Sequence, residues 1–324
     1  MKNKKSIAVL SMFDGISCAK IATEKLSDEI QITKYYSSEI DNDCLKVQRY
    51  HYGNDPNFIP IGDVRKVNGT MLANDEPLLI IFGSACQNLS AANRTDRSGL
   101  KGSKSSLFYE AVRIIKEIKQ TNPNKKLFIL AENVNSMRNS DRDIISSELG
   151  LQPIMVNSRL LSAQVRHRNY WCSWSFPMPE DKGITYQSIV ENGIVDKLKS
   201  NPVMTGNVTN TPRGLRRYLS MHMGNILFDN DFTFNMTDEQ RIEFCEKVYQ
   251  NSGYDPKQKY DPLSIPNKHF RVLTVKESCR LQTIPDDYLD VPGISKTQKF
   301  KMVGNAMTVD VIAHILSFLP IDEL

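Results

Sequence analysis

One cysteine in this chain stands where catalysis is usual in an open α/β sheet. Cys86 lies in Phe82–Ser90 (FGSACQNLS), directly after the apolar run Leu78–Phe82. Such a run predicts a buried strand, and the loops at the carboxyl ends of these strands usually hold the reacting groups. A cysteine there can act as a nucleophile through its thiolate. The alternative is that Cys86 is a small buried hydrophobic side chain, as free cysteines often are.

Three further motifs follow in order: Glu132-Asn133-Val134, Gln164-Val165-Arg166-His167-Arg168 and Gly304-Asn305-Ala306. Glu132 ends an apolar run, so its carboxylate would stand at a strand end. Arg166 and Arg168 alternate, so a strand would turn both to one side, where a guanidinium can hold a carbonyl oxygen. His167 would face the other way, without a catalytic role. Taken alone, Glu132 could be an ordinary acid at a strand end, and the two arginines could be an ordinary pair on the protein surface.

Together these motifs resemble the DNA (cytosine-5)-methyltransferase family. The matching blocks run from Phe13 to Val309 in the order of the family's main class. The resemblance implies a doubly wound, mostly parallel α/β sheet of the Rossmann-like methyltransferase type, with a smaller, irregular target-recognition domain. The implied reaction is methylation of cytosine carbon 5 in double-stranded DNA, with S-adenosylmethionine as the methyl donor.

The resemblance gives the catalytic residues their roles. Carbon 5 of cytosine is a poor nucleophile, so Cys86 would first add to carbon 6 of the ring. Glu132 would stabilise the ring by hydrogen bonds to its nitrogen and exocyclic amine. Arg168 would contact the base, and Arg166 would support the catalytic loop or bind the DNA backbone.

The resemblance also implies a donor site. Gly15 would let the backbone approach the ligand, although the sequence around it is not a GxGxxG motif. Glu39, beside Ile40, would hold ribose hydroxyls, and Asp63, beside Val64, would accept from the adenine amine; both could equally be solvated loop acids. The other expected donor-binding residues are Phe13, Asp14, Gly15, Ile16, Ser17, Ser84, Asn305 and Ala306.

A base within a duplex cannot reach Cys86, so it must be rotated out while a loop closes around it. The polar stretch 88–104 could be that mobile loop, or a solvated basic loop. The expected DNA contacts are Gln87, Ser90, Arg94 and Arg97 in this region, with Lys101 and Lys104 as further phosphate contacts, and Arg213, Arg216 and Arg217 in the second domain. Nothing identifies the target sequence.

Composition sets wide limits. The chain has 324 residues with 41 basic and 37 acidic side chains, a net charge of +4 that permits nucleic-acid binding without demonstrating it. Six cysteines without CxxC spacing indicate neither a zinc site nor a disulfide framework, which fits a reducing cytoplasm. We expect no metal, signal peptide or membrane span.

Alternating apolar runs and helical patterns predict the sheet up to about residue 174. The expected strands are Ile7–Met12, Ile32–Ser37, Leu78–Phe82, Leu127–Ala131 and Pro153–Asn157, with helices expected at Ser17–Leu26 and through Leu107 to Ile118. We expect three segments: 1–177 for catalysis and donor binding, 178–268 for target recognition with a helix over Asp238–Tyr249, and 269–324 returning to the first domain. In the last segment Glu277 and Arg280 would form a structural pair, and Met302–Leu316 a helix.

One departure from the family stands beside the nucleophile, because Ala85 occupies the position of the family's proline. Loss of the ring frees the backbone, so we expect a looser catalytic loop and slower turnover or an enlarged donor pocket.

Three other activities are open on the sequence. The same catalytic set occurs in a branch that methylates transfer RNA, but its Cys-Phe-Thr tripeptide is missing here. A DNA-binding protein without catalysis would fit Ala85, but not the retained Cys86, Glu132 and Arg168. A nicotinamide dehydrogenase is disfavoured by the missing GxGxxG. We expect a stand-alone monomer of bacterial or phage type, acting on DNA at the nucleoid, with a cognate restriction endonuclease as a further partner.

Overall fold

A computed structural model describes residues 4–26, 28, 30–90, 96, 98–103, 105–205, 218, 224–228, 237, 239–240 and 270–323. The chain divides into two compact units. The first comprises Met1–Asn157, His167–Pro179 and Ala306–Leu324, and the second Ser158–Arg166 and Glu180–Asn305. Residues 270–305 therefore group with the second unit, whereas we expected the return to the first at residue 269.

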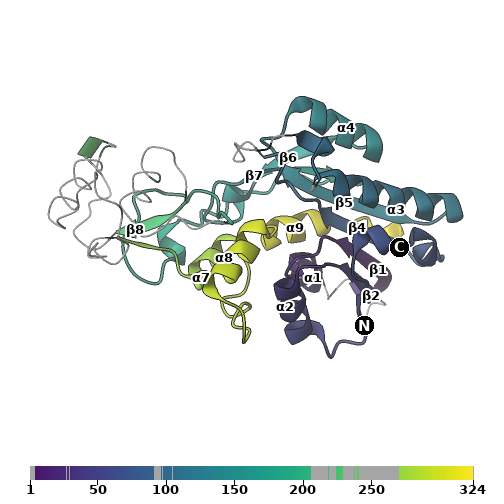
Figure 1. Cartoon of the computed structure of the whole chain (residues 1–324), viewed down its shortest axis with the longest axis horizontal. Helices are drawn as coiled ribbons and strands as arrows, with labels where there is room; N and C mark the ends of the chain where they lie inside the picture. Colours follow the sequence, from purple (N-terminus) through teal and green to yellow (C-terminus); the bar gives the residue numbers. More distant parts are fainter. Residues whose placement is uncertain are drawn as a thin grey trace. The chain divides into compact units, whose positions relative to one another are not determined.

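The first unit is built on a seven-stranded sheet in the order β3-β2-β1-β4-β5-β7-β6 (Figure 1). The strands are β1 Lys5–Met12, β2 Ile30–Ser38, β3 Phe58–Pro60, β4 Leu78–Gly83, β5 Leu127–Val134, β6 Pro153–Asn157 and β7 His167–Cys172. Neighbouring strands are parallel except at β7, which runs antiparallel to both β5 and β6. The expected doubly wound, mostly parallel sheet is confirmed.

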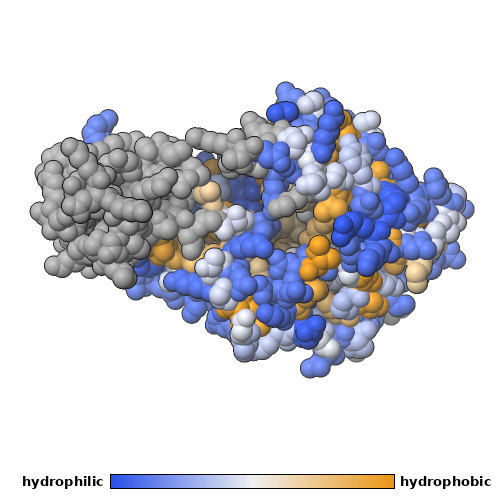
Figure 2. Space-filling view, viewed as in Figure 1, coloured by the Kyte–Doolittle hydropathy of each residue, from blue (hydrophilic) through white to orange (hydrophobic). Residues whose placement is uncertain are grey.

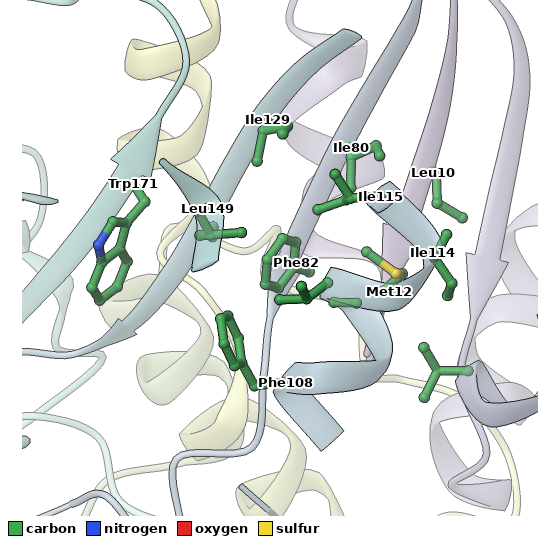
Figure 3. Packing of buried hydrophobic residues seen from close by; sticks show 14 of the residues in the cluster. Leu10, Met12, Ile80, Phe82, Phe108, Ile114, Ile115, Ile129, Leu149 and Trp171 are labelled. Carbon is green, nitrogen blue, oxygen red and sulfur yellow. The ribbon is translucent and has the colours of Figure 1, made fainter. Parts of the chain in front are cut away.

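Helices cover both faces of this sheet. They are α1 Cys18–Glu24, α2 Asn42–Tyr52, α3 Phe108–Thr121, α4 Asn139–Leu149 and α9 Val309–Leu316. The α3 side chains Phe108, Ile114 and Ile115 are buried against strand residues such as Phe82, because their spacing gives the helix one apolar face (Figure 3). On the other face, Trp174 packs on Phe128 and donates to the carbonyl of Ile315 in α9.

The topology changes direction between β1 and β4. The chain proceeds from β1 outward through β2 and β3, then returns to β4 on the other side of β1 and proceeds to β5. Loops leaving β1 and β4 therefore proceed to opposite sides, and the carboxyl ends of strands at such a point are the usual ligand position in these sheets. Met12 is paired with Phe82, and Gly83 with Glu132, so the loops of interest begin side by side.

The second unit contains a two-stranded sheet of β8 Ile226–Phe228 and β9 Phe270–Val272, followed by α7 Val275–Leu281 and α8 Lys296–Asn305. The expected pair of Glu277 and Arg280 is wrong. Glu277 is fully buried and binds Arg271, whereas Arg280 binds Asp286. Thr274 and Glu277 form a capping box that starts α7.

Two expected helices differ from the structure. The expected helix Met302–Leu316 is two helices, since α8 ends at Asn305 and α9 begins at Val309. The expected helix Asp238–Tyr249 lies almost wholly outside the described residues.

Short 3₁₀ turns link the elements at Val64–Lys66, Gly69–Leu72, Gly99–Lys101, Ser105–Leu107, Ser158–Leu160, Gln187–Ile189 and Ile321–Glu323. In the described part of the chain, no helix is both long and apolar enough to cross a membrane. On the face shown in Figure 2, hydrophilic side chains predominate, with smaller apolar areas between them.

Candidate active site

Glu132 and Arg168 form an ion pair at the carboxyl edge of the parallel strands. Glu132 lies near the end of β5 and Arg168 near the start of β7, and the Arg168 Nε lies 2.8 Å from the Glu132 Oε1. Their side chains are only 12% and 16% exposed, so little water screens the pair. A second Arg168 nitrogen donates to the carbonyl of His167, which fixes the guanidinium orientation.

Gly83 leaves the space that the Glu132 carboxylate occupies. The two residues are directly paired between β4 and β5. A Cβ atom at Gly83 would lie 3.2 Å from the Glu132 Oε2 and 3.8 Å from the sulfur of Met307. Any side chain at residue 83 would push against the carboxylate. Glycine at the end of β4 therefore lets Glu132 keep its position.

Cys86 opens a tight turn just beyond β4. Its carbonyl accepts hydrogen bonds from the amides of Leu89 and Ser90, at 3.0 and 2.8 Å. The cysteine is half-buried and packs against the main hydrophobic cluster. The loop is also joined to β5, because the Asn133 amide donates to both the carbonyl and the hydroxyl of Ser84 at 3.1 Å. The nucleophile candidate and Glu132 are thus carried on cross-linked neighbouring segments.

Arg166 has a different position from the one expected. It precedes β7, belongs to the second unit and is 4% exposed. Its guanidinium donates to the carbonyls of Val203 and Gly304, both at 3.2 Å. A Cβ at Gly304 would lie 2.5 Å from the Met204 backbone, so this glycine permits a close chain crossing. Arg166 therefore holds the second unit together, and its buried head does not present itself to a DNA backbone.

The loop after β1 is held in an unusual backbone conformation. Phe13, Gly15 and Ser17 all have left-handed φ angles, of 56°, 56° and 61°. For the two residues with side chains, this costs about 1 kcal/mol or more each, so surrounding contacts must hold the loop. The Gly15 amide donates to the Glu39 carboxylate at 2.8 Å, and the Gly15 carbonyl accepts from Gln48 at 2.8 Å. A Cβ at Gly15 would meet nothing within 4 Å, so this backbone is open to a ligand.

Asp14 lies beneath this loop, where we expected a donor contact. Its carboxylate is 4% exposed and accepts from the side chains of Ser11, Ser17, Tyr35, Ser37 and Gln48. Burial raises the pKa of Asp14, although the hydroxyl donors act in the opposite direction. Burial, with the Asp14 charge beside it, raises the pKa of Tyr35 well above its ordinary value. Asp14 therefore organises the loop from inside.

The other expected donor residues fall into two groups. The side chains of Ile16, Ser17, Val64, Ser84 and Ala306 are buried, so any part in donor binding would be through their backbone or their support of neighbours. Ile40 is 58% exposed beside Glu39, and Asn305 is exposed at the end of α8 in the second unit. Glu39 accepts from the amides of Ile40 and Asp41 as well as that of Gly15.

Asp63 is paired within its own turn. Its carboxylate accepts from the Arg65 side chain at 2.5 Å and from the Arg65 amide at 3.0 Å. The hydrogen bonds from Arg65 lower the pKa of Asp63 to about 2. The residue is thus a fixed acceptor at the start of the Val64–Lys66 turn.

The DNA-contact residues are only partly described. Gln87 and Lys101 are exposed, and Ser90 is half-buried. The expected contacts Arg94, Arg97, Lys104, Arg213, Arg216 and Arg217 lie outside the described residues.

A family model of the C-5 cytosine-specific DNA methylases matches residues 7–319. The chain belongs to this family. It is therefore an enzyme, a DNA (cytosine-5)-methyltransferase. The methylase is 24% identical to the Type II methyltransferase M.DsaV of Dactylococcopsis salina, over 99% of this chain and 89% of that protein. It is also 24% identical to the Type II methyltransferase M1.ScrFI of Lactococcus lactis subsp. cremoris, over 95% of this chain and 76% of that protein.

The fold of the methylase is shared with a solved methyltransferase. The structure of EhMeth from Entamoeba histolytica superposes with a TM-score of 0.69 at 13% identity, covering 99% of this chain and 100% of that one. The family and fold together imply use of S-adenosylmethionine as the methyl donor.

Several residues that build this site carry no local motif. Gln48 reaches Gly15 from the middle of α2, and Ser105 and Asp141 bind the catalytic loop from segments further along the chain. The one sequence signal was the pair of glycines in Gly99–Gly102, since a glycine often marks a close approach of two segments.

Proposed function

We propose that this methylase transfers a methyl group from S-adenosylmethionine to carbon 5 of cytosine in double-stranded DNA, through a covalent adduct between Cys86 and a base rotated out of the helix. The observation that carries the proposal is the Glu132–Arg168 pair on the strand edge next to the Cys86 turn. A nucleophile, a carboxylate and a guanidinium there match the three needs of the reaction: attack, ring stabilisation and orientation of the base.

Each side chain has a definite part in the proton and electron movements. The Cys86 thiolate adds to carbon 6, and the electron pair of the ring double bond moves towards carbon 5, which takes the methyl group. Solvent water then takes the carbon 5 proton, the electron pair of that bond re-forms the double bond between carbons 5 and 6, and the bond between Cys86 Sγ and carbon 6 breaks with its electron pair leaving as the thiolate. Glu132 holds the ring nitrogen and exocyclic amine, and Arg168 holds the base carbonyl oxygen while it orients Glu132.

The residues around the β1 loop fit an adenosyl donor. The open Gly15 backbone, the Glu39 carboxylate, the exposed Ile40 side chain and the Asp63 carboxylate offer a close approach, ribose acceptors, an apolar contact and an amine acceptor. When bound, S-adenosylmethionine supplies an electrophilic methyl group. Asp14 and Gln48 keep the loop in the conformation that this binding needs.

DNA would be bound by residues around the catalytic turn and by the second unit. Gln87 and Ser90 are the described candidates beside Cys86. Arg94, Arg97, Arg213, Arg216 and Arg217 are the candidates for phosphate and groove contacts outside the described residues. Since the relatives are Type II methyltransferases, we propose a restriction endonuclease of the same DNA specificity as a functional partner, and a monomer as the acting form.

The test is a methylation assay with labelled S-adenosylmethionine and a mixed-sequence duplex pool, followed by base-resolution mapping. Wild type should place the methyl group at cytosine carbon 5, and Cys86→Ala should place none. Transfer RNA in a parallel reaction should remain unlabelled. Labelling of RNA alone, or of DNA by Cys86→Ala, would contradict the proposal.

A further inference from the structure

We propose that Ser105 is a positioning residue for Cys86, holding the Ala85 carbonyl before the nucleophile and the Asn88 side chain after it. The inference rests on the proposed role of Cys86. The Ser105 hydroxyl donates to the carbonyl of Ala85 at 2.9 Å, across 20 residues of chain. The Ser105 amide donates to the side-chain oxygen of Asn88 at 3.3 Å. One residue therefore binds both the position before Cys86 and the position two residues after it.

The Ser105 side of this contact is shielded from water, while Ala85 is half-buried. Ser105 is fully buried and Asn88 is 5% exposed. The Asn88 carbonyl accepts from the Gly99 amide at 3.2 Å, and a Cβ at Gly102 would lie 2.3 Å from the Asn88 Cγ. The described residues 98–103 and 105 are therefore closely packed on the Cys86 turn. Removal of the Ser105 hydroxyl would take this donor away from the half-buried Ala85 carbonyl.

Ser105 can transmit rigidity because it is joined directly to a packed helix. It starts the short turn Ser105–Leu107 that leads into α3, whose first residue, Phe108, is buried in the core (Figure 3). A second anchor holds the same segment, since the buried Asp141 carboxylate of α4 accepts from the Leu100 amide at 3.0 Å. A Cβ at Gly99 would lie 2.4 Å from that carboxylate. The turn around Cys86 is thus fixed to two packed helices.

The Ser105 contact performs the task that a ring would perform at Ala85. A proline fixes its own φ through covalent geometry. Ala85 has no ring, and its carbonyl is instead held by a hydrogen bond from a buried side chain. Among the residues that the structure describes, none accepts a hydrogen bond from the Ala85 amide, so a proline at that position would remove no donor in use.

The first test compares Ser105→Ala with Ser106→Ala. Ser106 is the matched control, because among the described residues its hydroxyl binds the nearby Ser103 carbonyl, at 3.2 Å, and no part of the Cys86 turn. The readouts are the single-turnover rate of covalent complex formation on a duplex containing 5-fluorocytosine, the dissociation constant for S-adenosylmethionine, and Tm. We expect Ser105→Ala to slow the covalent step about tenfold with little change in donor affinity, whereas Ser106→Ala stays within about twofold of wild type.

The second test adds Ala85→Pro. If Ser105 and a proline ring restrain the same backbone, adding Ala85→Pro to Ser105→Ala should raise the rate of the covalent step at least about threefold. A double variant no faster than Ser105→Ala, or a Ser105→Ala rate equal to that of Ser106→Ala, would overturn the inference. Ser105→Cys is the second variant if Ser105→Ala does not fold, because a thiol is close to a hydroxyl in size but is a weak donor. A slower covalent step in Ser105→Cys than in Ser106→Ala would support the inference, and equal rates would overturn it. Absence of a covalent complex with wild type would instead refute the proposed function.

Discussion

Glu132 and Arg168 face each other diagonally across β5 and β7, with the guanidinium Nε 2.8 Å from the carboxylate Oε1. Because directly paired residues of antiparallel strands share a face, alternate residues of both strands bring the two side chains together. The pair orients the carboxylate before any base arrives. A substitution that alters the geometry of this ion pair should therefore lower the turnover rate more than the stability of the fold.

Arg168→Lys keeps the charge but loses the planar fork that binds Glu132. We expect kcat to fall about 10- to 100-fold, with Tm nearly unchanged, because an ammonium cannot hold carboxylate and base together in the same geometry. Steady-state kinetics and thermal unfolding measure the two effects. Arg142→Lys, at an exposed position on α4, is the control and should leave both unchanged.

Arg166→Met should show the opposite pattern, a large loss of stability. The substitution leaves the buried carbonyls of Val203 and Gly304 without this donor, which should lower the unfolding free energy by about 1–3 kcal/mol for each group. Chemical denaturation measures the change. An unchanged midpoint with a collapsed reaction rate would return Arg166 to a direct role in catalysis.

Asp14→Asn should destabilise the loop that carries the donor site. All five side chains around Asp14 donate to it. In asparagine the amide nitrogen is itself a donor, so it would stand opposite another donor and form no hydrogen bond with it. We expect a loss of about 1–3 kcal/mol in unfolding free energy and weaker S-adenosylmethionine binding. Calorimetry with and without the donor measures both. A fully retained stability would mean that Asp14 is already held as a neutral acid.

The Asp63–Arg65 pair should persist in acid. The pKa of Asp63 is lowered to about 2, so its contribution to stability is fully present above its unfolded pKa, about 3.9, and is lost as pH falls through 2. The Tm difference between wild type and Asp63→Asn should be constant above about pH 4 and shrink towards pH 2. A difference that grows in that interval would contradict the lowered pKa.

The sheet was predictable because its strands are short apolar runs with clear ends. Pro153–Asn157 matches β6, and the other four expected strands each lie wholly within an observed strand. The strand β3 was missed, since its three residues include a proline and show no pattern. The break between α8 and α9 was also missed, because the apolar residues Ala306 and Met307 continue the pattern beyond Gly304 and Asn305.

The chemistry of the site was more predictable than its support. Glu132 and Arg168 were expected together from their motifs, and the structure pairs them. Asp14 and Arg166 were assigned outward roles because sequence gives residue type without the direction of the side chain. Their burial follows from contacts with Gln48, Val203 and Gly304, which no local pattern connects to them.

The reversed direction of β7 determines which part of the chain positions Arg168 at the catalytic edge of the sheet. A strand parallel to β5 would reach the catalytic edge with its last residues, whereas β7 reaches it with its first. Arg168 is therefore governed by the connection before it, residues 158–166, and not by the body of a strand. Side chains alternate between the faces of a sheet, so a single inserted residue that shifted the β7 register would exchange Arg168 for His167 beside Glu132. Insertions or deletions in that connection are thus a route by which a lineage could lose methylation while keeping a folded sheet.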